Sequence, residues 1–221
     1  MTVLSVVTDL NLSSPDLAPF EHEFSSSLVV PEEVADLLFR EAATAYSFSD
    51  EPVTDEQFRA VHDLVKWGPT AMNTQPLRVV LVRSPEARER LVEHMSGNNK
   101  GRTQAAPLVA LLAADVDFHD ELPRVFPAVP NARDNFGDEQ VRAAMAHTSA
   151  VLQAGYFIIG VRAAGLAAGP MGGFDADAVS QEFFPDGRHR ALLVVNLGHP
   201  APDAFRPRQP RLDYDEVVTS V

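Results

Sequence analysis

Residues Glu139 to Gly165, EQVRAAMAHTSAVLQAGYFIIGVRAAG, form the longest helical pattern in the chain. From Val151 to Ile159 the stretch is apolar nearly all round, and a helix without a polar face belongs inside a protein. Its many small residues allow neighbouring elements to approach closely. We therefore expect a long, buried, central helix. His147 lies on it, where a lone histidine is more often a hydrogen-bonded core residue than a catalyst.

The segments around this helix alternate between helical and extended patterns. Helices are expected at 31–42, 54–67, 85–95 and 176–183, and strands at 77–82, 107–114 and 190–197. Thr54 and Gln57 have the spacing of a capping box at the second helix. Residues 96–104 are expected to form a polar loop. Residues 116–138 are expected to form a long loop of the kind that often covers a site.

Composition restricts the class of protein. The chain has 221 residues, 45% of them hydrophobic, which suits one domain with a sizeable core. The absence of cysteine excludes disulfides and cysteine-based catalysis or metal sites. A net charge of −13 argues against nucleic-acid binding. Without an apolar run of membrane-spanning length or a basic N-terminal signal, we expect a cytoplasmic protein. Residues 1–30 are expected to be an arm, packed on the body or on a partner subunit, and residues 31–221 the domain.

Side-chain motifs for acid–base or metal chemistry are scarce. Gly165 to Gly169 follows a helix rather than a strand, so it is not a dinucleotide-binding fingerprint. The chain has no P-loop, no nucleophile elbow and no zinc-binding helix, and its seven histidines show no metal-ligand spacing. We therefore assign no catalytic side chain and no metal site. If the protein is an enzyme, a bound cofactor is expected to supply the chemistry.

The segment Trp67 to Pro76, WGPTAMNTQP, is the first candidate site. Glycine and proline allow irregular backbone here, and the amides of Asn73 and Gln75 offer donors and acceptors without charge. Such a loop can meet the edge of a polar, planar ligand. The alternative is an ordinary helix end, a proline stop and a turn into the next strand.

Two further segments are candidates for binding. Gly172 and Gly173 offer backbone amides that no side chain obstructs. Arg206, Arg208 and Arg211 lie within six residues of one another in an acidic chain, which suggests an anion such as a phosphate, because arginine presents a planar fork of donors. The alternative is a rim of surface salt bridges. Lys100 and Arg102 could also reach an anion, although exposed bases in a loop are more often only solvated.

Taken in order, these segments resemble the nitroreductase family of flavin oxidoreductases over roughly residues 31–221. The resemblance is carried by Pro52-Val53, Gly68 to Pro76, Pro107, Gly169 to Phe174, Leu197 to Pro200 and the C-terminal pattern Arg206-x-Arg208-x-Pro210. Trp67 to Thr70, Gly169 to Asp175 and the segment from Leu122-Pro123 to Phe126-Pro127 are most similar to the branch that contains malonic semialdehyde reductase.

The resemblance implies an α+β fold with a central mixed sheet flanked by helices, in a homodimer with two FMN sites at the subunit interface. It implies ping-pong hydride transfer from NADH or NADPH to a small carbonyl, nitro or quinone-like electron acceptor. The contacts that it implies to FMN are Asn73 and Gln75 at the pyrimidine edge, the backbone of Pro170, Met171, Gly172 and Gly173 at the flavin centre, and Arg206 and Arg208 at the phosphate.

One segment departs from the family pattern. The family carries a phosphate-binding arginine after its first helix, whereas residues Ala43 to Ser49 contain no arginine or lysine. Losing one charge-assisted phosphate contact costs about 1.5–3 kcal/mol, or roughly one to two decades of affinity. A site with many other contacts tolerates that loss. The alternative is a dimer that has kept the fold, has lost FMN and uses the interface pocket to bind another ligand without redox chemistry.

Overall fold

The computed structural model describes residues 28–221, so the expected N-terminal arm lies outside the described residues except for Leu28 to Val30. The centre is a four-stranded sheet in the order β1-β2-β4-β3. The strands are β1 (Leu77–Val82), β2 (Leu108–Asp115), β3 (Ala167–Met171) and β4 (His189–Gly198). The expected α+β class is confirmed.

The expected mixed sheet is wrong, because every pair of neighbouring strands in the described chain is antiparallel. The cause lies in the connections. Each of the segments between β1 and β2 and between β3 and β4 leaves and re-enters the sheet at the same end, so that Val82 at the end of β1 lies opposite Val109 near the start of β2. Each returning strand therefore runs in the opposite direction to its neighbour.

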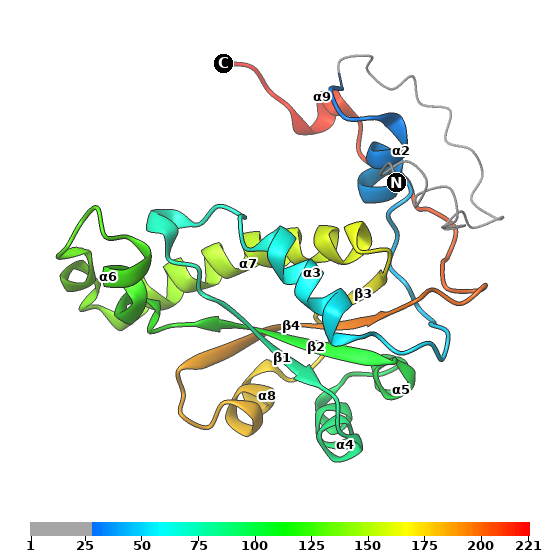
Figure 1. Cartoon of the computed structure of the whole chain (residues 1–221), viewed down its shortest axis with the longest axis horizontal. Helices are drawn as coiled ribbons and strands as arrows, with labels where there is room; N and C mark the ends of the chain where they lie inside the picture. The colour runs from blue at the N-terminus through cyan, green and yellow to red at the C-terminus, as the bar shows by residue number, and fades with distance from the viewer. Residues whose placement is uncertain (1–27) are drawn as a thin grey trace.

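Helices cover both faces of the sheet. They are α2 (Glu32–Ala35), continued by a π-helical turn to Arg40, α3 (Asp55–Val65), α4 (Pro85–His94), α5 (Asn99–Ala105), α6 (Leu122–Val125), α7 (Glu139–Ala163), α8 (Ala176–Phe183) and α9 (Tyr214–Val217). Figure 1 shows α3 and α7 on one face and α4, α5 and α8 on the other, with α2 and α9 away from the sheet. β2 is buried along its whole length between the two layers.

Alternation along β2 divides the core. Leu108, Ala110 and Leu112 join the cluster formed with α3 and α7. Val109 and Leu111 join the cluster on the opposite face. Since side chains of a strand point to its two faces in turn, a strand buried on both faces is apolar throughout. The continuous apolar run in the sequence follows from this position.

The long helix α7 lies where the sequence predicts it, but one of its faces is exposed. Asp138 caps its first turn by accepting hydrogen bonds from the backbone of Gln140 and Val141, at 2.8 and 3.2 Å. The helix packs on all four strands. Val151, Leu152 and Tyr156 are 45–50% exposed, so the expectation of burial from Val151 to Ile159 holds only for the sheet side. By length and composition α7 could also span a membrane, but its contacts with the whole sheet make it the core helix of this fold.

Gly160 sets the distance between α7 and α3. A Cβ atom at this position would lie 2.2 Å from Cγ1 of Val65. We expect Gly160→Ala to lower the free energy of unfolding by about 1–3 kcal/mol through overpacking, with part of the loss recovered when Val65→Ala is added. Urea unfolding of the two single variants and the double variant measures this. Strictly additive effects in the double variant would contradict the contact.

Two elements that carry candidate residues differ from expectation. Residues 96–104 were expected to be a loop, yet they contain most of α5. The buried guanidinium of Arg88 donates to the carbonyl oxygens of Thr103, at 3.0 Å, and Ala106, at 2.5 Å, which satisfies the end of this short helix. β3 was not expected; it contains Pro170, which is tolerated because β3 is an edge strand.

Candidate functional site

The loop between α3 and β1 has unusual backbone geometry. Met72, Asn73 and Gln75 have φ values of 51°, 53° and 45°, in the left-handed region that side chains other than glycine rarely adopt. Such residues cost on the order of 1–3 kcal/mol each and cluster at functional sites, where the surrounding structure holds them in place. The alternative of an ordinary turn does not require three of them within four positions.

Hydrogen bonds hold this loop against the segment 116–138. The side-chain amide of Asn73 donates to the carbonyl oxygen of Val125 in α6 at 2.7 Å. The amide of Gln75 donates to Oδ1 of Asn73 at 3.0 Å. The expected covering loop of residues 116–138 contains α6 and two 3-10 turns, Phe118–Glu121 and Ala132–Phe136. Asn73 and Gln75 are therefore fixed to each other and to α6.

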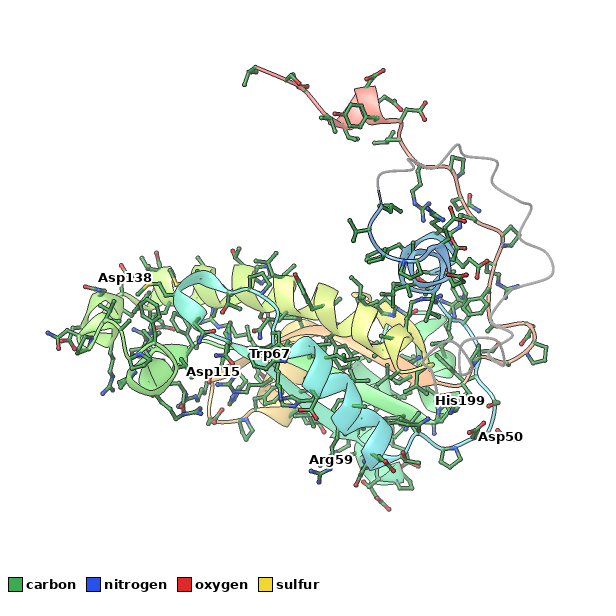
Figure 2. The ribbon with its side chains drawn as sticks, turned by 45° about the horizontal axis from the view of Figure 1, so that its top comes forward. Asp50, Arg59, Trp67, Asp115, Asp138 and His199 are labelled. Atoms are coloured by element: carbon green, nitrogen blue, oxygen red, sulfur yellow. The ribbon has the colours of Figure 1, made fainter. Side chains whose placement is uncertain are left out.

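The buried carboxylate of Asp115 is connected to the same loop through Arg78. Arg78 donates to the carbonyl oxygen of Gln75 and to Oδ2 of Asp115, both at 2.8 Å. Arg188 donates to the other oxygen of Asp115 at 2.9 Å, and this hydrogen bond raises the pKa of the Arg188 guanidinium above its usual value. Figure 2 shows Asp115 near the end of the molecule where Asp138 caps α7, far from His199. No motif in the sequence indicates this anchor.

A separate cavity of about 250 Å³ lies beside β3. It is lined by Thr44, Ala45, Tyr46, Asn99, Arg102, Gly169, Pro170, Met171 and Asn196. The backbone of Ala45 donates to the carbonyl oxygen of Ala168 at 2.9 Å, which brings the two walls together. A Cβ atom on Gly169 would lie 2.6 Å from the carbonyl oxygen of Ala45, so glycine is required for this close approach.

Arg102 lines the cavity, and Arg206 lies near the Tyr46 ring in its wall. The Arg102 guanidinium lies 4.3 Å from the centre of the Tyr46 ring, and that of Arg206 lies 5.7 Å from the same ring. Arg208 donates to the carbonyl oxygen of Ala42 at 3.1 Å. Within residues 28–221 none of these three arginines, nor Arg211, forms a salt bridge. Among the described residues the C-terminal arginines therefore form no rim of salt bridges.

Of the residues expected at the flavin centre, Pro170 to Gly173, only the first two, Pro170 and Met171, line the cavity. A side chain on Gly172 would meet open space, whereas one on Gly173 would collide with Asn99, whose amide donates to the Gly173 carbonyl oxygen at 3.1 Å. The structure thus places Pro170 and Met171 in the cavity that Arg102 and Arg206 flank. Asn73 and Gln75 do not line this cavity, and Gln75 borders a different hollow beside α3.

The cavity residues fit a phosphorylated, hydroxyl-bearing cofactor such as FMN. Asn196 is 2% exposed, and its Oδ1 atom has no hydrogen-bond partner in the described chain. A buried acceptor without a partner calls for a donor, which a ligand hydroxyl can supply. Arg102 and Arg206 provide positive charge for a phosphate. The chemistry of the donors and acceptors therefore matches a polyol phosphate.

Comparison with known proteins identifies the family of this chain. The model of the nitroreductase family matches residues 40–199. The chain belongs to the nitroreductase family. A protein of Streptomyces coelicolor, provisionally named NADH dehydrogenase/NAD(P)H nitroreductase, is 61% identical over 196 residues, which cover 88% of this chain and 100% of that protein.

Solved structures of nitroreductase relatives share the fold. A provisionally assigned nitroreductase of Exiguobacterium sibiricum, in complex with FMN, has a TM-score of 0.70 at 16% identity, over 90% of this chain and 100% of that one. The NADPH:FMN oxidoreductase of Vibrio harveyi, complexed with NAD+, has a TM-score of 0.68 at 19% identity, over 85% and 76% of the two chains. At these identities the similarity establishes the nitroreductase fold.

Sequence reasoning undervalued two residues of this nitroreductase cavity and misjudged a third residue elsewhere. Arg102 was treated as a base in a solvated loop. Asn196 is the one polar residue in the apolar run from Ala191 to Leu197, and that break in the pattern could have identified it. His147 was expected to be a hydrogen-bonded core residue, but it is exposed and has no hydrogen bond within the described chain, because Ala146 and Ala150 take the buried positions on α7.

Proposed function

We propose that the protein is an FMN-dependent NAD(P)H oxidoreductase of the cytoplasm that reduces a small carbonyl, nitro or quinone-like acceptor by a ping-pong mechanism. The observation that carries the proposal is the cavity beside β3, which has Arg102 in its wall and Arg206 near its Tyr46 ring, neither with a carboxylate partner in the described chain. Family membership and the names of its relatives support the same reading. When bound, FMN would accept a hydride from NAD(P)H and pass reducing equivalents to the acceptor.

In this proposal the residues of the chain bind and orient FMN. Arg206 and Arg208 hold the phosphate, and the Asn196 side chain accepts a hydrogen bond from a ligand hydroxyl. The backbone of Pro170 to Gly173 lies against the flavin centre, where Gly172 leaves space. Asn73 and Gln75 form hydrogen bonds with the polar pyrimidine edge of the flavin ring. Arg78 holds their loop in place through its hydrogen bond to the Gln75 carbonyl oxygen. No side chain is assigned to proton transfer.

The proposed enzyme acts as a homodimer. The cavity does not include Asn73 or Gln75, so one chain alone does not bring all the proposed FMN contacts into one site. Leu152 and Tyr156 on α7 are half exposed, Gly68 packs against the Tyr156 ring, and its neighbour Trp67 is 79% exposed. Large exposed apolar side chains at one place on a surface are typical of an interaction site. Sedimentation at micromolar concentration should give the mass of a dimer, and a monomer would contradict this part of the proposal.

The proposed acceptor class follows the malonic semialdehyde reductase branch. The support is the segment from Leu122-Pro123 to Phe126-Pro127, in which α6 contacts the Asn73 loop. We expect the flavin-loaded enzyme to reduce malonic semialdehyde with a higher kcat/KM than a nitroaromatic compound or a quinone. Steady-state assays with all three acceptors measure this. A preference for either of the other two would reject the branch while leaving the oxidoreductase proposal intact.

The decisive experiment is a visible spectrum. The protein purified from cells, with FMN added and the excess removed, should show flavin absorption that bleaches under anaerobic conditions with NADH or NADPH. A colourless protein that takes up no FMN would reject the proposed function.

A second candidate function is a dimer that binds another ligand without redox chemistry. It is motivated by the absence of a cation between Ala43 and Ser49. Under this hypothesis Ala43→Arg should create FMN binding where the wild type has none. If the wild type already binds FMN tightly and Ala43→Arg changes little, the hypothesis fails.

A further inference from the structure

We propose that Arg102 binds the cofactor phosphate in place of the arginine that is missing near Ala43. This inference rests on the proposed function and deepens it by naming a ligand from a different part of the chain. The family position lies after the first helix, whereas Arg102 lies on α5, between β1 and β2. Both reach the same place because Thr44 to Tyr46 and Arg102 line one cavity.

The Tyr46 ring brings Arg102 and Arg206 together. The backbone N–H of Tyr46 donates to the carbonyl oxygen of Ala204 at 2.8 Å, which fixes residue 46 beside the C-terminal arginines. The guanidinium of Arg102 lies 4.3 Å from the ring centre, within cation–π range, and that of Arg206 lies at 5.7 Å. Within the described chain neither guanidinium forms an ion pair with a carboxylate. Both therefore keep a positive charge with which they can bind an anion.

Arg102 is presented by a helix that is held firmly. The buried Arg88 donates to the carbonyl oxygens of Thr103 and Ala106, directly after Arg102. On the preceding turn, the amide of Asn99 donates to the carbonyl oxygen of Gly173. The helix is thereby tied to β1 through α4 and to the end of β3. A fixed cation loses less side-chain entropy on binding a phosphate than a solvated one does.

Asn196 supplies an independent indication of the ligand's chemistry. Its Oδ1 atom is buried in the wall of the same cavity and has no partner. A phosphate cannot satisfy this acceptor, because at neutral pH it is mainly an acceptor itself. A hydroxyl group can. The two arginines and the buried acceptor together match a phosphate ester on a polyhydroxylated chain. FMN carries such a chain, and riboflavin has the same chain without the phosphate.

The test compares FMN with riboflavin in the full-length protein. Arg102→Gln removes the charge and keeps a polar side chain of moderate length. We expect it to raise the dissociation constant for FMN about 10- to 100-fold, as measured by flavin fluorescence quenching, and to leave that for riboflavin unchanged within about two-fold. Lys100→Gln is the matched control, because Lys100 is exposed on the same helix, donates to the carbonyl oxygen of Glu93 and does not line the cavity. The FMN affinity of this variant should equal that of the wild type.

Each outcome decides between the claims. A wild type that binds no FMN rejects the proposed function itself. A wild type that binds FMN, with Arg102→Gln binding it equally well, overturns the inference and leaves the function standing. Equal losses for FMN and riboflavin also overturn it, since they indicate a structural role. Adding Ala43→Arg to Arg102→Gln should recover FMN affinity at least ten-fold; no recovery would overturn the claim that one cation replaces the other.

Discussion

Asp115→Ala is expected to lower the free energy of unfolding by about 3–5 kcal/mol, the range found when one partner of a buried ion pair is removed. The carboxylate is 1% exposed and accepts hydrogen bonds from Arg78 at 2.8 Å and from Arg188 at 2.9 and 3.1 Å. Both arginines would lose their main acceptor. Because their side chains are about one-third exposed, water would compensate in part, which favours the lower end of the range. Urea unfolding gives the value.

Asp120→Ala is the matched control for this prediction. Its carboxylate also pairs with Arg188, at 3.3 Å, and with Arg133, at 2.8 Å, but its side chain is 37% exposed. An exposed pair contributes about 0–1 kcal/mol, so the control should be nearly as stable as the wild type. Similar losses for the two variants would show that burial of Asp115 is not what makes it important. Asp115→Ala should also speed hydrogen exchange in the Gln75 loop, since Arg78 connects the two.

The double variant Arg206→Gln/Arg208→Gln is expected to raise the dissociation constant for FMN by about 10²- to 10⁴-fold, because each charge-assisted hydrogen bond contributes about 1.5–3 kcal/mol. Riboflavin affinity should change far less. The measurement is a fluorescence titration at fixed ionic strength, since phosphate contacts weaken as salt screens them. Arg208 also donates to the Ala42 carbonyl oxygen, so the melting temperature is recorded alongside.

Arg83→Gln/Arg90→Gln makes the same change in charge elsewhere. These arginines pair with Asp55 and Glu182 and do not line the cavity. If this control lost FMN affinity as strongly, general electrostatics rather than a phosphate site would explain the result. If the Arg206/Arg208 variant bound FMN as the wild type does, the C-terminal arginines would not be phosphate ligands.

Elements whose signals are local could be predicted from the sequence. The capping box of Thr54 and Gln57 forms with both of its hydrogen bonds, at 2.9 and 3.1 Å, and β1 begins and ends at the expected residues. Elements stabilised from a distance could not. The helix α5 depends on the guanidinium of Arg88, which arrives from α4 and has no signature in residues 96–104. The antiparallel order of the sheet is likewise a property of the connections.

In the candidate site too, some residues were indicated by the sequence and others were not. Pro170 and Met171 line one cavity, and Arg206 lies near the Tyr46 ring in its wall, but their contacts with FMN stay a prediction. Arg102 joins them only because α5 folds back onto Tyr46, which no spacing in the sequence reveals. Asn73 was correctly singled out as part of an unusual loop, but its role toward a ligand stays a prediction. The left-handed backbone of Met72 and Gln75 was not foreseen, because neither residue type favours it.

The strain in that loop has a consequence for protein engineering. Met72 and Gln75 each hold about 1–2 kcal/mol of backbone strain, a sizeable fraction of the 5–15 kcal/mol that stabilises a typical domain. Glycine adopts the same backbone without that cost. A laboratory selection for heat resistance alone would therefore favour glycine at these two positions. If the rigid loop binds a ligand, the selected variants would be more stable and would bind that ligand less tightly. A screen for stability at these positions therefore needs a binding assay at every round.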